Sequence, residues 1–492
     1  MARPAARVAA ALAAATALLA PSSRAIGPHE VALVVNDASV ESVVLGAVWA
    51  RLRSIPQSNV VRVSIPPGPD GNPPEAITRE DFNRLIYRPV SEELNRRDEA
   101  RRIGVILAWA YSCGMPARVT ASESGLRTPS TNDLSLAGAT FLRGSFPEGD
   151  EAATAAEYVS PLYAGPDARF IDGTNMVPVG FSGPANSFDR RVNELLNRMP
   201  LPSFMLAWTG AHGLSLTSAV EAIERSAAAD RTAPTGTIAF VRRKDVRDAA
   251  RAWQYGPVVD NLEALSRDVF GSVTEVPPDA SSGPIVGYMT GAAEVSPMPA
   301  LAPGAYADHF TSYAAAFARP TQTKAVRWLE SGAAFSSGTV CEPFAIWAKF
   351  PTAWIFPRLV SGATAIEAFF ASVRCPLQIQ PIGDPLCAPW APEIKPEIEV
   401  KTQASEPFGD QVSLSAVLTG ASPDVSPDDV KFYWFVDNRQ VGSGRELKWD
   451  AGAEQPGPHE LRLVARLQHT HERPQGFVVR TFETTARAEA LR

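Results

Sequence analysis

The chain has 492 residues, of which 45% are hydrophobic and 20% are charged, an ordinary composition for a globular protein. This length exceeds what one hydrophobic core usually supports, so we expect two or more domains. The formal net charge is -7, and the sequence contains no run of Lys and Arg residues, which argues against a nucleic-acid partner.

Residues 1–25 have the pattern of a secretory signal peptide. Arg3 and Arg7 precede an apolar run, Val8–Ala20, and small residues suited to cleavage end at Ala25. The run is shorter than the roughly 20 residues that cross a bilayer, and no later apolar run reaches about 18 residues. We therefore expect an exported protein that begins near Ile26 and has no transmembrane segment after the signal peptide. The alternative is an N-terminal anchor that stays attached.

The first 110 residues alternate apolar strands with helices. Strands are predicted over Val31–Val35, Asn59–Ile65 and Ile103–Trp109. One helix is predicted after Ser39, which can cap it, and another over Thr78–Arg97. This alternation is typical of a mostly parallel sheet covered by helices.

Residues 114–200 interrupt the alternation. They are rich in Ser, Thr, Gly and Pro, and we expect an irregular but ordered excursion over the sheet, because its aromatic side chains need burial. The alternation then resumes, and further strands are predicted over Phe204–Trp208, Gly236–Val241, Val273–Val276, Ile285–Tyr288, Ala333–Val340 and Leu377–Ile382. The helices predicted among them are Ser215–Ala229, Val246–Trp253, Val258–Phe270 and Thr323–Gly332.

A change in composition near residue 391 indicates a domain boundary. A linker is predicted over Ala391–Pro396, and alternating strands follow it. We therefore expect an α/β domain over residues 26–394 and an immunoglobulin-like β-sandwich over residues 395–492 that folds alone. Trp434, on a middle strand, is the predicted centre of the sandwich core.

Four polar residues follow apolar strands in the last part of the α/β domain. Asp308 and His309 end one strand, Glu342 follows the next, and Asp384 follows Leu377–Ile382. Because parallel strands share one carboxyl edge, we expect these side chains to share one crevice. Together they could form the acid/base set of a hydrolase. The alternative is structural: His309 bonded within a loop, and Glu342 and Asp384 serving turns.

The four cysteines leave their pairing open. Export would permit disulfides, but the strand between Cys375 and Cys387 spans about 20 Å, whereas a disulfide needs Cα atoms within about 7 Å. A Cys341–Cys375 bond and four unpaired thiols, Cys113 included, both remain possible. A nucleophilic dyad of Cys341 and His309 is a further hypothesis, set against a structural cysteine.

Other catalytic patterns are absent from the sequence. The His and Cys residues show no HxH, HExxH or CxxC spacing, so we expect neither a metal nor another cofactor. Ser312 lacks the G-x-S-x-G surroundings of a serine nucleophile.

Several sequence blocks resemble a family of exported bacterial proteins that is uncharacterised. The resemblance is carried by Val31–Ile65, Met205–Gly210, Ser337–Pro343, Lys349–Pro351 and Gly383–Trp390. It covers most of residues 30–391 and implies no particular activity.

The order of elements more distantly resembles that of gingipain-type cysteine peptidases. These have a caspase-like α/β domain followed by an immunoglobulin-like domain, with a Gly-His-Gly turn after one strand, a nucleophilic Cys at the end of the next and a later Gly-Asp-Pro. Here Tyr288–Ala292 stands at the first position without a His, and Phe310–Tyr313 at the second without a Cys. Gly383-Asp384-Pro385 agrees.

This resemblance implies a caspase-like fold without its peptidase machinery. We therefore expect a catalytically degenerate relative that binds a protein or cell-surface partner in the periplasm, in the cell envelope or outside the cell. The alternative is an active hydrolase that uses Asp308, His309, Glu342 and Asp384.

Overall fold

The computed structural model describes residues 26–68, 71–100, 104–146, 156, 158–172, 175–181, 200–266, 268–402, 405–468 and 474–487. The signal peptide predicted over residues 1–25 lies outside these ranges. In the described part of the chain, no helix combines the length and the apolar character needed to cross a membrane.

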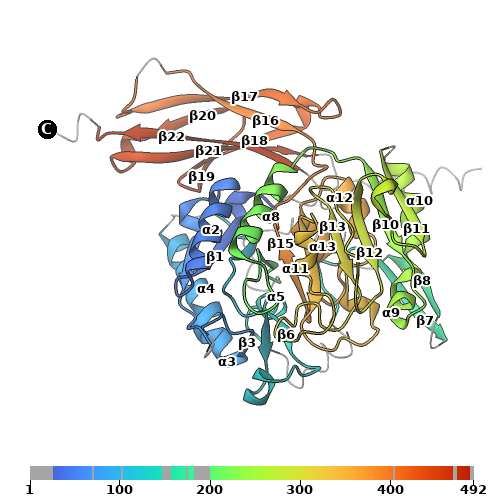
Figure 1. Cartoon of the computed structure of the whole chain (residues 1–492). Helices are drawn as coiled ribbons and strands as arrows, with labels where there is room; N and C mark the ends of the chain where they lie inside the picture. Colours follow the sequence, from blue (N-terminus) through green and yellow to red (C-terminus); the bar gives the residue numbers. More distant parts are fainter. Residues whose placement is uncertain are drawn as a thin grey trace, which may run out of the picture.

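A ten-stranded sheet forms the centre of the α/β domain, in the order β11-β10-β12-β13-β14-β15-β9-β4-β1-β2 (Figure 1). Its strands are β1 (Val31–Asn36), β2 (Val60–Val63), β4 (Ala108–Tyr111), β9 (Ser203–Met205), β10 (Gly236–Val241), β11 (Val269–Thr274), β12 (Ile285–Thr290), β13 (Tyr306–His309), β14 (Phe335–Thr339) and β15 (Ile379–Gly383). Most of them are continuous apolar runs buried on both faces, as the sequence predicts.

One antiparallel step divides this sheet into two halves. Every neighbouring pair of strands is parallel except β14 and β15, which pair antiparallel from Phe335 opposite Gly383 to Thr339 opposite Ile379. The predicted mostly parallel sheet is therefore confirmed. However, β11, β10, β12, β13 and β14 run in one direction, whereas β15, β9, β4, β1 and β2 run in the other.

Helices pack on both faces of the sheet (Figure 1). They are α2 (Val40–Leu52), α3 (Arg79–Phe82), α4 (Arg88–Glu99), α5 (Leu136–Phe141), α8 (Leu216–Ala228), α9 (Val246–Ala252), α10 (Tyr255–Leu265), α11 (Val326–Glu330), α12 (Ile355–Val360) and α13 (Ala365–Ser372). Ser39 and Ser215 cap α2 and α8 through their side chains, as expected for serine at that position.

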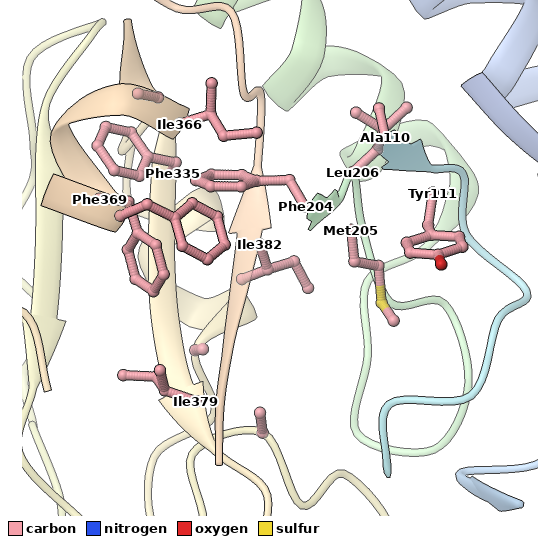
Figure 2. Packing of buried hydrophobic residues seen from close by; sticks show 14 of the residues in the cluster. Ala110, Tyr111, Phe204, Met205, Leu206, Phe335, Ile366, Phe369, Ile379 and Ile382 are labelled. Carbon is pink, nitrogen blue, oxygen red and sulfur yellow. The ribbon is translucent and has the colours of Figure 1, made fainter. Parts of the chain in front are cut away.

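Aromatic packing joins the two halves of the sheet. The rings of Phe204 on β9 and Phe335 on β14 have their centroids 6.0 Å apart, and Phe369 on α13 lies 5.6 Å from Phe204. Figure 2 shows these rings beside Ile382 of β15. The core is therefore continuous across the antiparallel step.

Two predicted boundaries are wrong. The helix predicted over Val258–Phe270 ends at Leu265, because the residues from Val269 onward pair with β10 as the edge strand β11. The third strand, predicted over Ile103–Trp109, begins only at Ala108. At Val269 the apolar run was compatible with a helix or a strand, and pairing with β10 decided for the strand.

The described parts of the 114–200 excursion are ordered. They contain α5, the strands β5 (Arg118–Thr120) and β6 (Leu134–Ser135), and a hairpin of β7 (Pro166–Asp172) and β8 (Asn175–Phe181). A strand from before the excursion, β3 (Ala76–Thr78), completes a small sheet with β5 and β6. A buried ion pair joins Arg118 to Asp133 at 2.6 Å. These segments are less irregular than the sequence predicts, and residues 147–155, 157, 173–174 and 182–199 of the excursion lie outside the described ranges.

The C-terminal strands form two antiparallel sheets around a shared core. The strands are β16 (Ile394–Val400), β17 (Gln411–Ala421), β18 (Val430–Val436), β19 (Arg439–Ser443), β20 (Glu446–Asp450), β21 (Gly457–Leu467) and β22 (Gln475–Thr484). The predicted linker overlaps β16, which already begins at Ile394. Trp434 is fully buried in this core and donates a hydrogen bond to the carbonyl oxygen of Gly444 at 2.9 Å, so its predicted role is confirmed.

Buried polar contacts join the two domains. Arg466 of β21 pairs with Glu30 at 3.1 Å, and both side chains are almost fully buried. The amide nitrogen of Asn438 donates to the amide oxygen of Asn59 at 2.7 Å. Figure 1 shows the sandwich above the α/β domain, close to α2 and α8.

Candidate functional site

Asp308, at the end of β13, is held in a buried ion pair. Its two oxygens accept hydrogen bonds from Arg251 at 2.9 and 2.7 Å, and one of them also accepts from the Tyr306 hydroxyl at 2.7 Å. Burial alone would lower the pKa of Arg251, but the Asp308 carboxylate offsets this and raises it above its ordinary value. Both side chains are 1% exposed, so this carboxylate has no access to a solvent-borne substrate.

His309 uses both ring nitrogens within the core. Its Nδ1 accepts a hydrogen bond from Nε1 of Trp328 at 3.0 Å, and its Nε2 lies 3.0 Å from the carbonyl oxygen of Thr323. The first contact requires Nδ1 to be unprotonated, so Nε2 carries the proton and donates it. Burial lowers the pKa of His309 to about 3. The geometry is that of a structural histidine, the second of the two interpretations that the sequence allows.

Glu342 and Cys341 follow β14. Glu342 is partly buried and accepts a hydrogen bond from the backbone nitrogen of Phe344 at 3.0 Å, the turn role expected in the structural alternative. The Cys341 thiol contacts the carbonyl oxygen of Asp133 at 3.4 Å and Nε2 of Gln378 at 3.1 Å. These contacts, and those of His309, contradict the hypothesis of a Cys341–His309 dyad.

Asp384 fastens α2 to the sheet. One oxygen accepts hydrogen bonds from Nε1 of Trp49 at 3.0 Å and from the backbone nitrogen of Leu386 at 3.1 Å. The other accepts from Nε of Arg53 at 2.8 Å. Asp384 is fully buried, and the same arginine also binds Asp230. The carboxylate therefore caps a turn and anchors a helix at the same time.

A second charge balances Arg53. Burial by itself would lower the pKa of this guanidinium, but Asp384 and then Asp230 raise it well above its ordinary value. Asp230 accepts a further hydrogen bond from the backbone nitrogen of Ala388 at 2.9 Å. The three charged groups thus join α2 to the loops after α8 and β15.

The prediction that the four polar residues share one crevice is wrong. Asp308 and His309 end β13 and Glu342 follows its parallel neighbour β14, so these three belong to one edge of the sheet. Asp384 follows β15, which runs the opposite way, and its backbone nitrogen donates to Ala334, just before β14 begins. The expectation fails because it requires every strand of the domain to run in the same direction.

All four cysteines are buried, and none of them forms a disulfide. The Cys341–Cys375 bond is therefore not formed, and the alternative of four thiols holds. Burial raises the pKa of Cys375 to about 11 and raises the pKa of Cys341 and of Cys387 further. Thiols in this state are poor nucleophiles at neutral pH.

A cavity of about 340 Å³ lies where the two domains meet. The α/β domain contributes Arg53, Asp230 and Arg231, and the sandwich contributes Gln475 and Phe477. Asp230 is 22% exposed and Arg231 is exposed, so the cavity offers an accessible carboxylate and an accessible guanidinium. Its volume lies at the lower end of the range of small-ligand sites, about 300–1,000 Å³.

Arg53 and Asp230 are functional candidates that the sequence patterns do not single out. The Arg53–Asn59 turn belongs to one of the sequence blocks named in the sequence analysis, and this was the available signal. Arg53 of this turn donates a hydrogen bond to Asp384. Asn59 donates to the carbonyl oxygen of His29, next to β1, and accepts from Asn438 of the sandwich. Among the described residues, no group of three or more His, Cys, Asp or Glu side chains could hold a metal ion.

Comparison with models of known protein families finds no match, and comparison with curated proteins finds no significant match. One solved structure that matches part of the chain is described as "Structures of Clostridium thermocellum CbhA fibronectin(III)-like modules". It is 14% identical, with a TM-score of 0.15, and the match covers 24% of this chain and 55% of that chain. The chain therefore spans about half the length of this structure.

Proposed function

We propose that this chain is an exported, catalytically degenerate relative of caspase-like peptidases of the gingipain type, with an immunoglobulin-like second domain, and that it acts by binding. The proposal is carried by the buried structural contacts at the adjacent ends of β12 and β13. The resemblance puts the catalytic His and Cys at these strand ends. Thr290 stands beside His309 there. The Thr290 carbonyl accepts a hydrogen bond from the buried Arg251 at 3.1 Å, and its hydroxyl donates to Val241 at 2.8 Å.

The turn after β12 also has no space for a side chain at Gly291. A Cβ atom on Gly291 would lie 2.3 Å from the backbone nitrogen of Asp248 in α9. Such a contact would force the helix to move. Substitution of a histidine into this turn would therefore not restore a peptidase site without rebuilding its surroundings.

The junction cavity is the proposed binding site. Its walls include the apolar side chains of Leu52 and Phe477, and its accessible charges are Asp230 and Arg231. A carboxylate beside a guanidinium suits a ligand that carries both an amino group and a carboxylate, such as a short peptide. Binding of a peptide without cleavage fits a domain that has lost its catalytic groups.

One experiment tests binding and catalysis together. The full chain is incubated with a library of peptides of about three to six residues, binding is followed by saturation-transfer NMR, and cleavage is followed by mass spectrometry of the same samples. We expect a subset of peptides to bind and none to be cleaved. Arg231→Ala should abolish the binding signal, while Arg243→Ala, at another exposed arginine, should leave it unchanged.

Two results would contradict the proposal. Turnover of any peptide that disappears in a His309→Gln or Asp384→Asn chain would favour the hydrolase alternative. An absence of binding to the whole library would remove the junction cavity as a peptide site.

A further inference from the structure

Ile26, the first residue after the predicted signal peptide, is buried against a carboxylate. It is 1% exposed, and its backbone nitrogen donates a hydrogen bond to Oε1 of Glu367 at 3.0 Å. Glu367 is itself 3% exposed and lies in the first turn of α13. The nitrogen that leader removal would release as a new N-terminus is therefore already in contact with a buried acidic side chain.

The Glu367 carboxylate is held in place by its own helix. Its Oε2 accepts hydrogen bonds from the backbone nitrogen of Thr364 at 3.1 Å and from the Thr364 hydroxyl at 2.5 Å. This is a capping box, in which the glutamate of the first turn reaches back to the residue before the helix. Oε1, facing Ile26, is thus fixed in position by contacts that do not involve the N-terminal segment.

The segment that follows Ile26 touches the second domain. A Cβ atom on Gly27 would lie 2.2 Å from Nε2 of Gln475, so the backbone here passes close to the end of a β22 side chain. Three residues further on, Glu30 forms the buried ion pair with Arg466. Ile26 and Glu367 therefore sit at the junction of the two domains.

We propose that the bond between Ala25 and Ile26 is the processing site of this chain, and that the α-ammonium group released there forms an ion pair with Glu367 that stabilises the domain junction. Hydrolysis adds the hydroxyl group of water to the Ala25 carbonyl carbon and a proton to the Ile26 nitrogen. The new amine takes up a second proton at neutral pH, because its ordinary pKa is about 8. A neutral hydrogen bond then becomes a charge-assisted one, which is shorter and stronger.

The inference rests on the export proposed above. Two separate measurements distinguish a failure of the export proposal from a failure of the ion pair. Mass spectrometry of the native exported protein should give Ile26 as its first residue. An intact leader on the native protein would contradict removal of the signal peptide and this inference with it. Processing at a bond other than Ala25–Ile26 would leave export standing and overturn the ion pair.

The ion pair itself is tested on recombinant chains freed from a fusion partner so that they begin at Ile26. A sample whose α-amino group is selectively acetylated keeps an N–H donor at Ile26 but loses the charge. We expect the free amine to raise the melting temperature by about 3 °C over the acetylated form. In a Glu367→Gln chain the two forms should melt together, whereas Glu397→Gln, at an exposed carboxylate, should preserve the difference.

Equal melting temperatures for the free and acetylated forms of the otherwise unchanged chain would overturn the proposal, even if Glu367→Gln fails to fold. The same holds if the difference persists in a folded Glu367→Gln chain, because the charge would then act on another group.

Discussion

His309 shows how burial fixes the state of a single residue. Its pKa is about 3 in the folded chain and about 6.5 in an unfolded one. Between these values the unfolded chain takes up a proton that the folded chain excludes. The contribution of His309 to stability is therefore complete above about pH 6.5 and is lost as the pH falls toward 3. Arg251 and Lys324 lie near enough to disfavour a positive charge on the ring further.

We therefore expect His309 to make the protein sensitive to acid. Its titration should remove about 3 kcal/mol of unfolding free energy between pH 7 and pH 4. His309→Gln, which can still accept from Trp328 and donate to Thr323, should lose that much less stability over the same range. Urea unfolding at several pH values measures this, with His212→Gln, at an exposed histidine, as the control. Identical pH profiles for the parent and His309→Gln would contradict the assigned neutral state.

Replacing one partner of the buried Arg251–Asp308 ion pair should strongly lower the unfolding free energy. Arg251→Met leaves the Asp308 carboxylate without its cation and should cost about 3–5 kcal/mol in urea unfolding. Combining it with Asp308→Asn should recover part of that loss, because no uncompensated charge remains. Arg327→Met removes an exposed pair with Glu330 and should change stability by less than about 1 kcal/mol. Equal losses at Arg251 and Arg327 would show that burial does not govern the pair.

At this scale the sequence predicted where polar residues stand but not what they touch. The positions of Asp308, His309 and Asp384 at strand ends were readable from the apolar runs before them. Their partners are remote in the chain: Arg53 binds Asp384 across 331 residues, and Arg251 binds Asp308 across 57. A periodicity within a short window carries no information about such contacts.

At the scale of elements, the turn that ends β15 combines strain with close packing. Gly383 has a φ of +118°, and a Cβ atom there would lie 2.3 Å from the carbonyl oxygen of Ala334, just before the neighbouring strand β14. A side chain at this position therefore meets both a conformational penalty and a backbone clash. This explains the glycine of the Gly383-Asp384-Pro385 block without reference to catalysis.

Gly383→Ala should therefore destabilise the chain by about 3 kcal/mol or more. Gly444 is a matched control, since its φ is +97° but a Cβ atom added there would have no other atom within 4 Å. Gly444→Ala should cost only the conformational term, about 1 kcal/mol. Chemical denaturation of both variants gives the comparison. If Gly383→Ala is no worse than Gly444→Ala, the close approach to Ala334 is not restrictive.

Sequence patterns could not predict the direction in which β15 runs relative to β14. A buried strand gives the same continuous apolar run whether it pairs parallel or antiparallel. Leu377–Ile382 was correctly predicted to be a strand, close to the observed Ile379–Gly383. Its reversal relative to β14 moves Asp384 to the other edge of the sheet and separates the four candidate residues.

At the scale of the whole molecule, the two domains share a buried polar junction. The sandwich has its own core around Trp434, which supports the prediction that residues 395–492 fold alone. Yet Arg466 and Asn438 are buried against the first domain and would be exposed by separation. The junction should therefore couple the unfolding of the two domains.

We expect calorimetry of the full chain to give one cooperative transition, and Arg466→Met to split or broaden it. Without the Arg466 guanidinium, the buried Glu30 carboxylate loses its cationic partner in the sandwich, and the contact between the domains weakens. Arg445→Met, at an exposed sandwich arginine, should leave the transition single. A single unchanged transition in Arg466→Met would mean that the ion pair does not couple the domains.

Asp384 shows without any substrate whether the candidate acid/base residues are structural. Catalytic groups are often held in strained sites, so their replacement commonly leaves stability unchanged or raises it. Replacement of a structural carboxylate instead lowers it. The measurement is the unfolding free energy of Asp384→Asn beside that of Asp424→Asn, a change at an exposed carboxylate. For a structural carboxylate we expect a loss of about 3 kcal/mol at Asp384 and a change within about 0.5 kcal/mol at Asp424. A stable Asp384→Asn chain that has lost a hydrolytic activity of the parent would contradict this expectation.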